Sequence, residues 1–263
     1  MPTGVVFGVV LLALAGLLFW WQQKQKHQFH HLQAAKPVSV AELDKLAKRA
    51  DVEPGEWRHY VKVRGMIRCH QPLRCELKQQ KCVYYTMTVR REYEETIPHS
   101  HSNGEKNEKL QRQSEIVTTR EQATPFSLQD NTGEIAVDPE GAEIDRVKIL
   151  EEFRPEQVSG ILSFGQFRLT VPEIPENQRT IGYRYTEYIL PIYRQVLVVG
   201  EACQTENGWQ LRKPSEPDKQ YWITLKTEPE LTGVAGQNAK IFFYTAIACA
   251  IAGIVSIVLA LML

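Results

Sequence analysis

The chain has 263 residues, and its 31 Lys plus Arg are balanced by 31 Asp plus Glu, so the formal net charge is zero. A dedicated nucleic-acid-binding protein normally carries a basic excess, so this balance argues against nucleic acid as a partner. The charges are not spread evenly, because residues 1–21 and 241–263 contain no Asp, Glu, Lys or Arg. The sequence therefore predicts a polar central domain with an uncharged apolar segment at each end.

Both apolar end segments are predicted as transmembrane helices. As helices, Gly4 to Trp21 would extend roughly 27 Å and Ile241 to Leu263 roughly 34 Å, close to the ~30 Å hydrocarbon core of a bilayer. A signal peptide is the rival for the first segment, but no basic residue precedes its apolar run. We therefore expect an N-terminal transmembrane anchor over 1–23, a polar linker over 24–38, a β-domain over 39–238 and a C-terminal transmembrane helix over 239–263.

The flanks and the small residues of these segments bear on orientation and assembly. Lys24 and Lys240 lie on the central-domain side, and under the positive-inside rule they favour a cytoplasmic central domain in a two-span integral membrane protein. The second segment carries small residues at four-residue spacing from Ala248 to Ala260, which lets helices approach closely. Gly and Ala are also simply common in membrane helices. The expected partners are the lipid bilayer and a second copy of the chain in a homo-oligomer.

The central domain is predicted to be mainly β. Ser39 to Ala50 predicts a short amphipathic helix, because Ser39 and Glu42 have the spacing of a capping box. From Tyr60 onward the hydrophobic period changes to two, and short β-prone segments alternate with turns. The polar segment 92–113 shows no sustained period and predicts a mobile loop. The expected fold is an antiparallel β-domain, for which an OB-like barrel is one architecture.

The clearest local signal is the segment from Pro125 to Pro139. Its apolar residues alternate on both sides of a turn rich in Asp, Asn and Gly, which predicts a tight hairpin. We expect Gly133 in this turn to require a positive φ. A second hairpin is expected around Asn207-Gly208. Because side chains alternate between the faces of a strand, the residues expected to share one buried face of the first hairpin are Phe126, Leu128, Ile135 and Val137.

The sequence offers little chemistry. Cys69, His70, Cys75 and Cys82 could be assembled into a zinc set, but they are spaced more widely than the close pairs of structural zinc sites. A nucleophilic role for Cys82 would need a base that the sequence does not identify. There is no Gly-rich phosphate loop and no Gly-x-Ser-x-Gly elbow. We therefore predict no catalytic residue, no cofactor and no metal.

Short motifs spread over residues 72–202 carry a family resemblance. They are Pro72-Leu73, Cys82-Val83-Tyr84-Tyr85, the Pro125 to Pro139 hairpin, Glu187-Tyr188-Ile189-Leu190-Pro191 and Val198-Val199-Gly200-Glu201-Ala202. In this order and spacing they resemble the GIDE domain, also called the beside-a-membrane domain. The family-motif positions, which we expect to serve folding, are Cys82, Tyr84, Tyr85, Pro125, Phe126, Asp130, Gly133, Asp138, Pro139, Glu187, Leu190, Pro191, Gly200 and Glu201.

The resemblance implies a layout and a departure from it. The GIDE domain is known from mitochondrial RING-type E3 ubiquitin ligases, in which two spans flank the domain and a cytosolic RING follows. The five cysteines here include no Cys-x-x-Cys pair, whereas a RING is built from close Cys and His pairs. We therefore expect a RING-less member of the kind found in bacteria, cyanobacteria among them. In the mitochondrial relatives the domain faces the intermembrane space, which corresponds to a periplasm and opposes the orientation that the lysines favour.

Two functions remain open at this point. The first is a membrane-anchored binding or scaffold module that holds an unidentified protein partner beside the bilayer. The second is a component of a RING-type E3 ubiquitin-protein transferase, so enzymatic activity stays open, with the balance against it. A binding surface needs exposed aromatic or apolar side chains. The candidates are Trp57, Trp209 and Trp222, each of which also suits a core.

Overall fold

The computed structural model describes residues 35–227 except 51–56, 101–105, 156–159, 172–173, 176 and 206–207, together with residue 230 and isolated residues of both terminal segments. The chain divides into two compact units. One comprises residues 1–64 and 196–263, and the other comprises residues 65–195. The second unit is therefore a continuous stretch of sequence inserted into the first.

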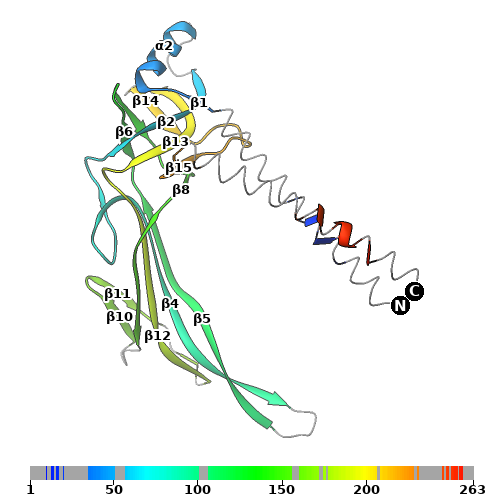
Figure 1. The fold of residues 1–263 in the computed structure, drawn as a ribbon. Coiled ribbons are helices and arrows are strands. Elements are labelled where there is room, and N and C mark those ends of the chain that lie inside the picture. Colours follow the sequence, from blue (N-terminus) through cyan, green and yellow to red (C-terminus); the bar gives the residue numbers. More distant parts are fainter. Residues whose placement is uncertain are drawn as a thin grey trace. The chain divides into compact units, whose positions relative to one another are not determined.

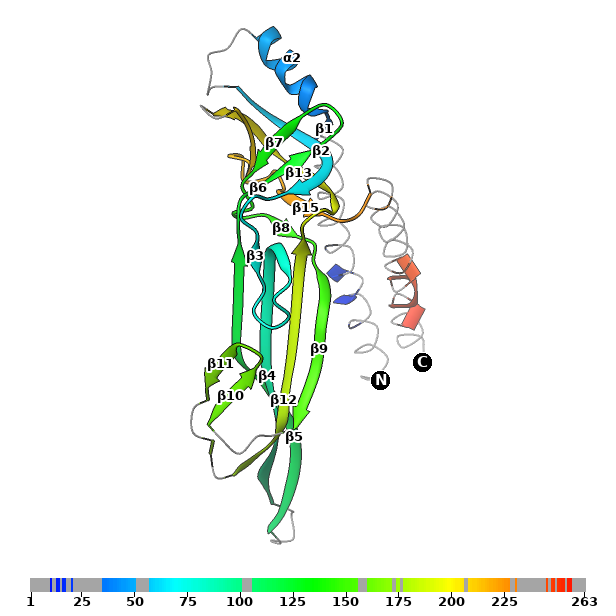
Figure 2. The same ribbon diagram turned by 90° about the vertical axis from the view of Figure 1, so that its left-hand side faces the viewer.

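A five-stranded antiparallel sheet forms the body of the unit 65–195 (Figures 1 and 2). Its central strands are β4 (Lys81–Ser100) and β12 (Gln178–Pro191), which pair with each other. β5 (Lys106–Ala123) pairs with the other edge of β4, and β9 (Val147–Pro155) pairs with the outer edge of β12. β3 (Leu73–Arg74) pairs with the beginning of β4. Figure 2 shows β5, β4, β12 and β9 side by side in that order.

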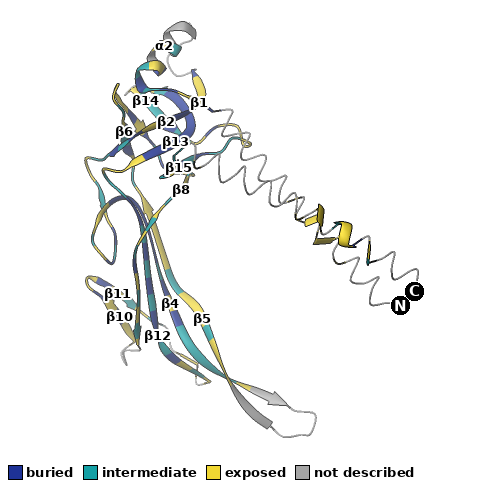
Figure 3. Cartoon of the chain, in the orientation of Figure 1, coloured by how far each residue is buried: buried dark blue, intermediate teal, exposed yellow. Residues whose placement is uncertain are grey.

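One face of this sheet carries the core of the unit. Met87 and Val89 of β4 lie with Tyr185 of β12 in a buried apolar cluster. A hairpin of β10 (Ile161–Phe164) and β11 (Phe167–Thr170) completes the cluster with Leu162, Phe164 and Phe167. Figure 3 shows buried residues along β4 and many exposed ones along β5. Burying a large apolar side chain contributes ~1.5–3 kcal/mol, so this cluster is a main source of stability for the unit.

The predicted hairpin between Pro125 and Pro139 is confirmed. It consists of β6 (Phe126–Gln129) and β7 (Glu134–Val137), and its register pairs Phe126 with Val137 and Leu128 with Ile135. All four of these side chains are at most 4% exposed, as their alternation predicts. β8 (Glu143–Ile144) follows the hairpin in sequence.

The turn of this hairpin differs from the prediction. Positive φ angles among the described glycines occur at Gly141, Gly165 and Gly208, so the expectation of a positive φ at Gly133 is wrong. The Asp130 carboxylate holds the turn instead. It accepts hydrogen bonds from the backbone N–H of Thr132 at 2.6 Å and of Gly133 at 2.9 Å. An Asp side chain that mimics a backbone turn in this way removes the need for a left-handed residue.

The other unit combines a short helix with strands from both ends of the sequence. β1 (Lys36–Pro37) runs parallel to β2 (Arg58–Arg68), and α2 (Val40–Ala50) lies between them in sequence. β13 (Gln195–Thr205) pairs antiparallel with both β14 (Gly208–Arg212) and β15 (Trp222–Thr224). The predicted mainly β, largely antiparallel fold is thus confirmed, and among the described strands β1 and β2 form a parallel pair. The OB-like label stays a prediction.

The short helix begins as the sequence predicts. Glu42 accepts hydrogen bonds from the backbone N–H of Ser39 at 2.8 Å and from its hydroxyl at 3.1 Å, which is the expected capping box. These bonds lower the pKa of Glu42. The side chain of Leu43 on the inner face is fully buried. The helix is therefore fixed at its beginning by its cap and along one face by packing.

The predicted mobile loop over 92–113 is wrong for its described residues. Residues 92–100 continue β4 and residues 106–113 belong to β5, with register up to Ser100 and Lys106. The polar side chains here bind across the strands, as when Arg112 contacts Glu94 at 3.4 Å. Cross-strand pairs of opposite charge can stabilise a two-stranded ribbon whose sequence does not alternate between apolar and polar residues.

The prediction of two membrane spans, over 1–23 and 239–263, is contradicted. Among the residues that the structure describes, no helix is both long and apolar enough to cross a bilayer. α2 has 11 residues, which extend roughly 17 Å, and it carries Glu42 and Lys45. Most residues of the two terminal segments lie outside the described part of the chain.

Candidate functional site

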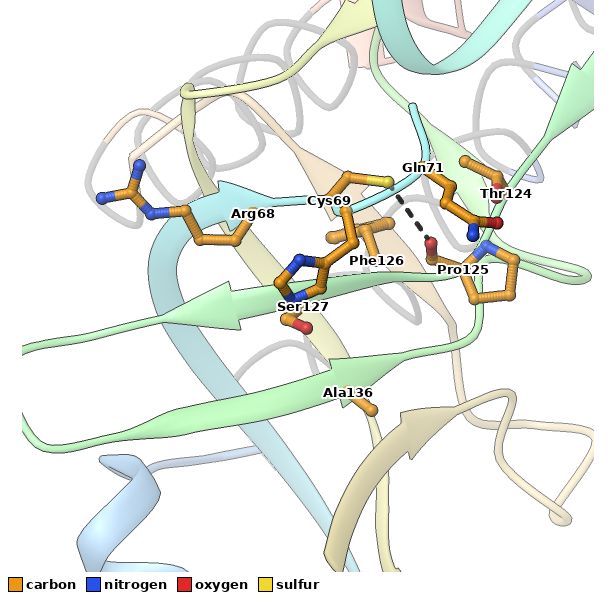
Figure 4. Close-up of a pocket in the computed structure, with 9 residues that line it drawn as sticks. Arg68, Cys69, Gln71, Thr124, Pro125, Phe126, Ser127 and Ala136 are labelled. Carbon is orange, nitrogen blue, oxygen red and sulfur yellow. Dashed lines mark hydrogen bonds between the residues drawn. The ribbon is translucent and has the colours of Figure 1, made fainter. Parts of the chain in front are cut away.

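An open cavity of about 410 Å³ lies in the unit 65–195 (Figure 4). It lies beyond the end of the pairing between β2 and β6, which joins Met66–Arg68 to Ser127–Gln129. The chain after β2 makes one wall, and the beginning of β6 makes the other. The lining residues are Arg68, Cys69, His70, Gln71, Thr124, Pro125, Phe126, Ser127 and Ala136.

The two walls of the cavity are joined by a cysteine. The thiol of Cys69 donates a hydrogen bond to the Pro125 carbonyl oxygen at 3.8 Å, as Figure 4 shows. Cys69 is partly exposed, whereas the other described cysteines are buried. Cys69 is therefore the accessible thiol among the described cysteines, and it lines the cavity.

The lining combines apolar surface with uncharged or basic polar groups. Pro125 and Ala136 are exposed, and Phe126 is 4% exposed beneath them. His70 and Gln71 are exposed polar side chains on the opposite wall. None of the nine lining residues carries a carboxylate. The cavity therefore suits an uncharged or acidic group better than a cation.

Arg68 stands at the rim of the cavity with its guanidinium fixed. Its Nε donates a hydrogen bond to Oε1 of Gln129 at 2.7 Å, and its guanidinium carbon lies 5.2 Å from the ring centroid of Tyr193. In Figure 4 the guanidinium points away from Cys69 and Pro125. Among the described residues, the Arg68 guanidinium makes a hydrogen bond through Nε to Gln129. Its two terminal nitrogens therefore stay available to a ligand.

Tyr193 owes its position to an unusual backbone. Its φ is 60°, in the left-handed region that residues other than glycine seldom adopt. Two backbone bonds hold it there, because Tyr193 donates its N–H to the Ile67 carbonyl at 3.1 Å and Ile67 donates its own N–H to the Arg194 carbonyl at 2.9 Å. The side chain is 61% exposed. Backbone strain of this kind clusters at binding and switch sites.

The family-motif residue Glu187 lies elsewhere, deep in the same unit. It is fully buried, and its two carboxylate oxygens accept hydrogen bonds from the backbone N–H of Leu77 at 2.8 Å and of Lys78 at 2.9 Å. These residues belong to the loop between β3 and β4. A buried carboxylate must be hydrogen-bonded, and here the backbone supplies both donors. The contacts favour a folding role for this residue.

Glu201 makes a similar arrangement in the other unit. It is 8% exposed, and it accepts hydrogen bonds from the backbone N–H of Ser215 at 3.2 Å and from Nη2 of Arg212 at 3.2 Å. Its neighbour Gly200 lies so close to Tyr221 that an added Cβ would stand 2.8 Å from the ring. A larger residue would therefore push these segments apart.

Two of the cysteines weighed for a zinc set are buried together. Cys75 and Cys82 lie in one buried cluster, and burial raises the pKa of Cys75 to about 11 and that of Cys82 to about 12. Such thiols stay protonated at neutral pH and are poor nucleophiles. Among the described residues, no group of three or more His, Cys, Asp or Glu side chains could hold a metal ion.

Two of the predicted family-motif residues, Pro125 and Phe126, line the cavity, and the others lie away from it. The hydroxyl of Tyr84 accepts a hydrogen bond from Arg146 at 3.3 Å, and that of Tyr85 donates to Gln122 at 3.2 Å. Asp138 accepts the N–H of Glu140 at 3.1 Å. Pro139 and Leu190 are buried, and Pro191 is partly buried.

The candidate aromatic surface is mostly interior. Trp57 is 5% exposed and meets Trp209 edge-on with ring centroids 4.9 Å apart, while Trp222 packs against a small buried cluster. Sequence reasoning missed Arg68 and Tyr193. No local pattern marks either one, since their contact joins residues far apart in the chain.

The comparison with protein families supplies the wider context. The family model GIDE, described as E3 ubiquitin ligase, matches residues 94–260, which is more than half of the chain. No similar curated protein and no similar solved structure was found. The matched range includes the β6–β7 hairpin, Glu187 and Glu201, so it agrees with the resemblance carried by the motifs from Pro125 onward, whereas the motifs at residues 72–73 and 82–85 precede it. On this match the chain belongs to the GIDE family.

Proposed function

We propose that the chain is a protein-binding module of the GIDE family, which recognises a partner through the cavity between β2 and β6. The observation that carries this proposal is the cavity of about 410 Å³ with an exposed, backbone-strained Tyr193 next to its rim residue Arg68. Concave sites with apolar walls and a few fixed polar groups are where ligands bind.

The family description adds a context for this module. It names E3 ubiquitin ligases, which act on other proteins and therefore need a recognition surface as well as a transfer activity. Recognition requires only shape and fixed contacts, which the cavity offers. We assign this chain to the recognition side, and a role as a component of a ubiquitin ligase follows if its partner is itself modified.

The test uses the full chain and random short peptides displayed on phage. Peptides selected on the chain are expected to slow the alkylation of Cys69 by iodoacetamide, because Cys69 lies in the cavity wall. The variant Ala136→Arg should abolish both binding and protection. Ala136 is exposed in the cavity, so a long side chain there fills the site without entering the core.

The matched control is Ala123→Arg, a change of the same size at an exposed position of β5 that does not line the cavity. It should leave peptide binding and Cys69 protection unchanged. Peptides that bind Ala136→Arg as well as the wild type, or that never protect Cys69, would show that the cavity is not the recognition site.

A further inference from the structure

We infer that the partner segment recognised by this cavity is an extended peptide with an Asp or Glu side chain, whose carboxylate is bound by Arg68 at the rim. This inference rests on the proposed function, since it names the chemistry of the partner at the same site. It is carried by four features of the described residues, which concern the guanidinium, its support, the charge of the lining and the adjoining surface.

The guanidinium of Arg68 has donors left for a ligand. Its Nε is bound to Gln129 at 2.7 Å, and this single bond sets the plane of the group. Both terminal nitrogens remain available, on the side away from Cys69 and Pro125 (Figure 4). Two parallel N–H groups in one plane match the two oxygens of a carboxylate, which makes such pairs both strong and directional.

The support behind the guanidinium is rigid. The ring of Tyr193 lies 5.2 Å from the guanidinium carbon, and the backbone of Tyr193 is held by the two hydrogen bonds with the strand end at Ile67. A long Arg side chain normally loses rotamer freedom when it binds a partner. Here the Gln129 bond and the Tyr193 ring have already fixed it, so less entropy is lost on binding.

The charge of the cavity favours an acid. Arg68 and His70 are the titratable basic groups of the lining, and no lining residue carries a carboxylate that would compete with a ligand. An acidic side chain therefore meets no repulsion from the lining residues. Because the rim is open to solvent, the attraction is screened by salt and acts mainly on specificity.

The adjoining surface accepts the residue next to the acid. Pro125 and Ala136 expose apolar surface within the cavity, while Arg68 stands at its edge. An extended peptide places neighbouring side chains on opposite sides and alternate ones on the same side. A peptide with an uncharged side chain in the cavity can thus present an acidic residue nearby in sequence to Arg68.

The test analyses the peptides selected on the full chain and measures their affinity for rim variants. We expect the selected sequences to be enriched in Asp or Glu, and replacement of that acid by Asn or Gln to weaken binding about tenfold or more. Arg68→Gln should cause a loss of the same size. Arg68→Lys should recover part of it, because the charge returns without the planar pair of donors.

The control variant is Arg168→Gln, which removes an exposed Arg from β11 and should leave the affinity unchanged. Some peptides could lose binding to Ala136→Arg and still bind Arg68→Gln as tightly as the wild type. This result would overturn the carboxylate inference and leave the proposed peptide-binding function in place. Binding confined to phosphorylated peptides would overturn it as well. Peptides indifferent to Ala136→Arg would overturn the proposed function itself.

Discussion

At the scale of single residues, the two motif glutamates show how a family signature can record folding contacts. Glu187 is 110 positions along the chain from its backbone partner Leu77, and Glu201 is 14 positions from Ser215. Glu187 accepts two backbone N–H groups of the loop between β3 and β4, and Glu201 accepts the N–H of Ser215 between β14 and β15. Loops with buried N–H groups need such acceptors, because an unpaired buried donor is costly.

Glu187→Gln is expected to lower the free energy of unfolding by about 1.5–3 kcal/mol, because the amide places an NH₂ group against a backbone N–H and a charge-assisted bond is lost. Urea denaturation of the full chain measures this. The control Glu134→Gln, at an exposed site of β7, should stay within about 0.5 kcal/mol of wild type. Equal stability of the two variants would contradict the folding role of Glu187.

Buried thiols and phenols make the fold sensitive to alkaline pH. Burial raises the pKa of Cys82 from 9.0 to about 12, and burial likewise raises the pKa of Tyr60 from 10.0 to about 12. The folded state therefore keeps protons that the unfolded chain releases. Stability from these groups is complete below their ordinary pKa values and is lost as the pH rises toward the folded ones.

The free energy of unfolding should thus fall steadily from about pH 9 upward, by up to ~1.4 kcal/mol per pH unit for each such group. Cys82→Ala removes one group and should make the fall shallower, whatever it does to stability at neutral pH. Unfolding curves collected between neutral and alkaline pH measure the slope. An identical slope in the variant would show that Cys82 titrates alike in both states.

Local sequence could predict a residue's burial but not every partner. The alternation around Asp130 correctly placed the four apolar side chains of the β6–β7 hairpin, because each needs only its neighbours. The same pattern does not predict the turn, because the Asp130 carboxylate takes the place of a left-handed glycine. Arg68 and Tyr193 escaped notice because their contact depends on tertiary structure alone.

At the scale of elements, the β4–β5 hairpin has two parts with different support. Up to Glu95, β4 also pairs with β12, and Arg184 binds Glu92 across these strands at 2.7 Å. Beyond Thr96, the described residues of the hairpin pair only with each other. The sequence reads as a loop here because a ribbon exposed on both faces needs no apolar alternation.

Replacing residues 98–108 by Asn-Gly joins Ile97 to its cross-strand partner Lys109 through a two-residue turn and preserves the register. We expect the free energy of unfolding to change by less than about 1 kcal/mol, because no third strand is disturbed. Urea denaturation of the full-length variant provides the measurement.

A longer replacement serves as its contrast. Exchanging residues 92–114 for Asn-Gly joins Arg91 to Glu115, and it removes Glu92 and the part of β4 that pairs with the start of β12. It should destabilise the unit far more than the short replacement. If both variants unfold alike, the extended part of the hairpin is as important as the part covered by β12.

At the scale of the whole chain, the boundaries of the family match and of the folded unit differ. The match begins at residue 94, inside β4, whereas the unit begins at Gly65. A chain of residues 94–263 would lack Met87 and Val89 from the core cluster and would leave Glu187 without Leu77 and Lys78. A family range therefore does not mark a segment that folds by itself.

The 94–263 chain is expected to show no cooperative melting transition. It loses the first half of the core strand β4, and the carboxylate of Glu187 loses its two backbone hydrogen-bond donors. Circular dichroism and fluorescence melting curves, compared with those of the full chain, measure this. A cooperative transition close to that of the full chain would mean that β2, β3 and the first half of β4 are dispensable.

The order of the strands along the chain has a consequence for synthesis on the ribosome. β5 follows β4 directly, so their hairpin can close once Ala123 has emerged, but β12 begins only at Gln178. During that interval the second edge of β4 has no partner, and Met87 and Val89 lack their contact with Tyr185. Open β-edges pair readily with other chains. Slow translation between these two points would thus prolong the exposure and favour mispairing between nascent chains on one messenger RNA.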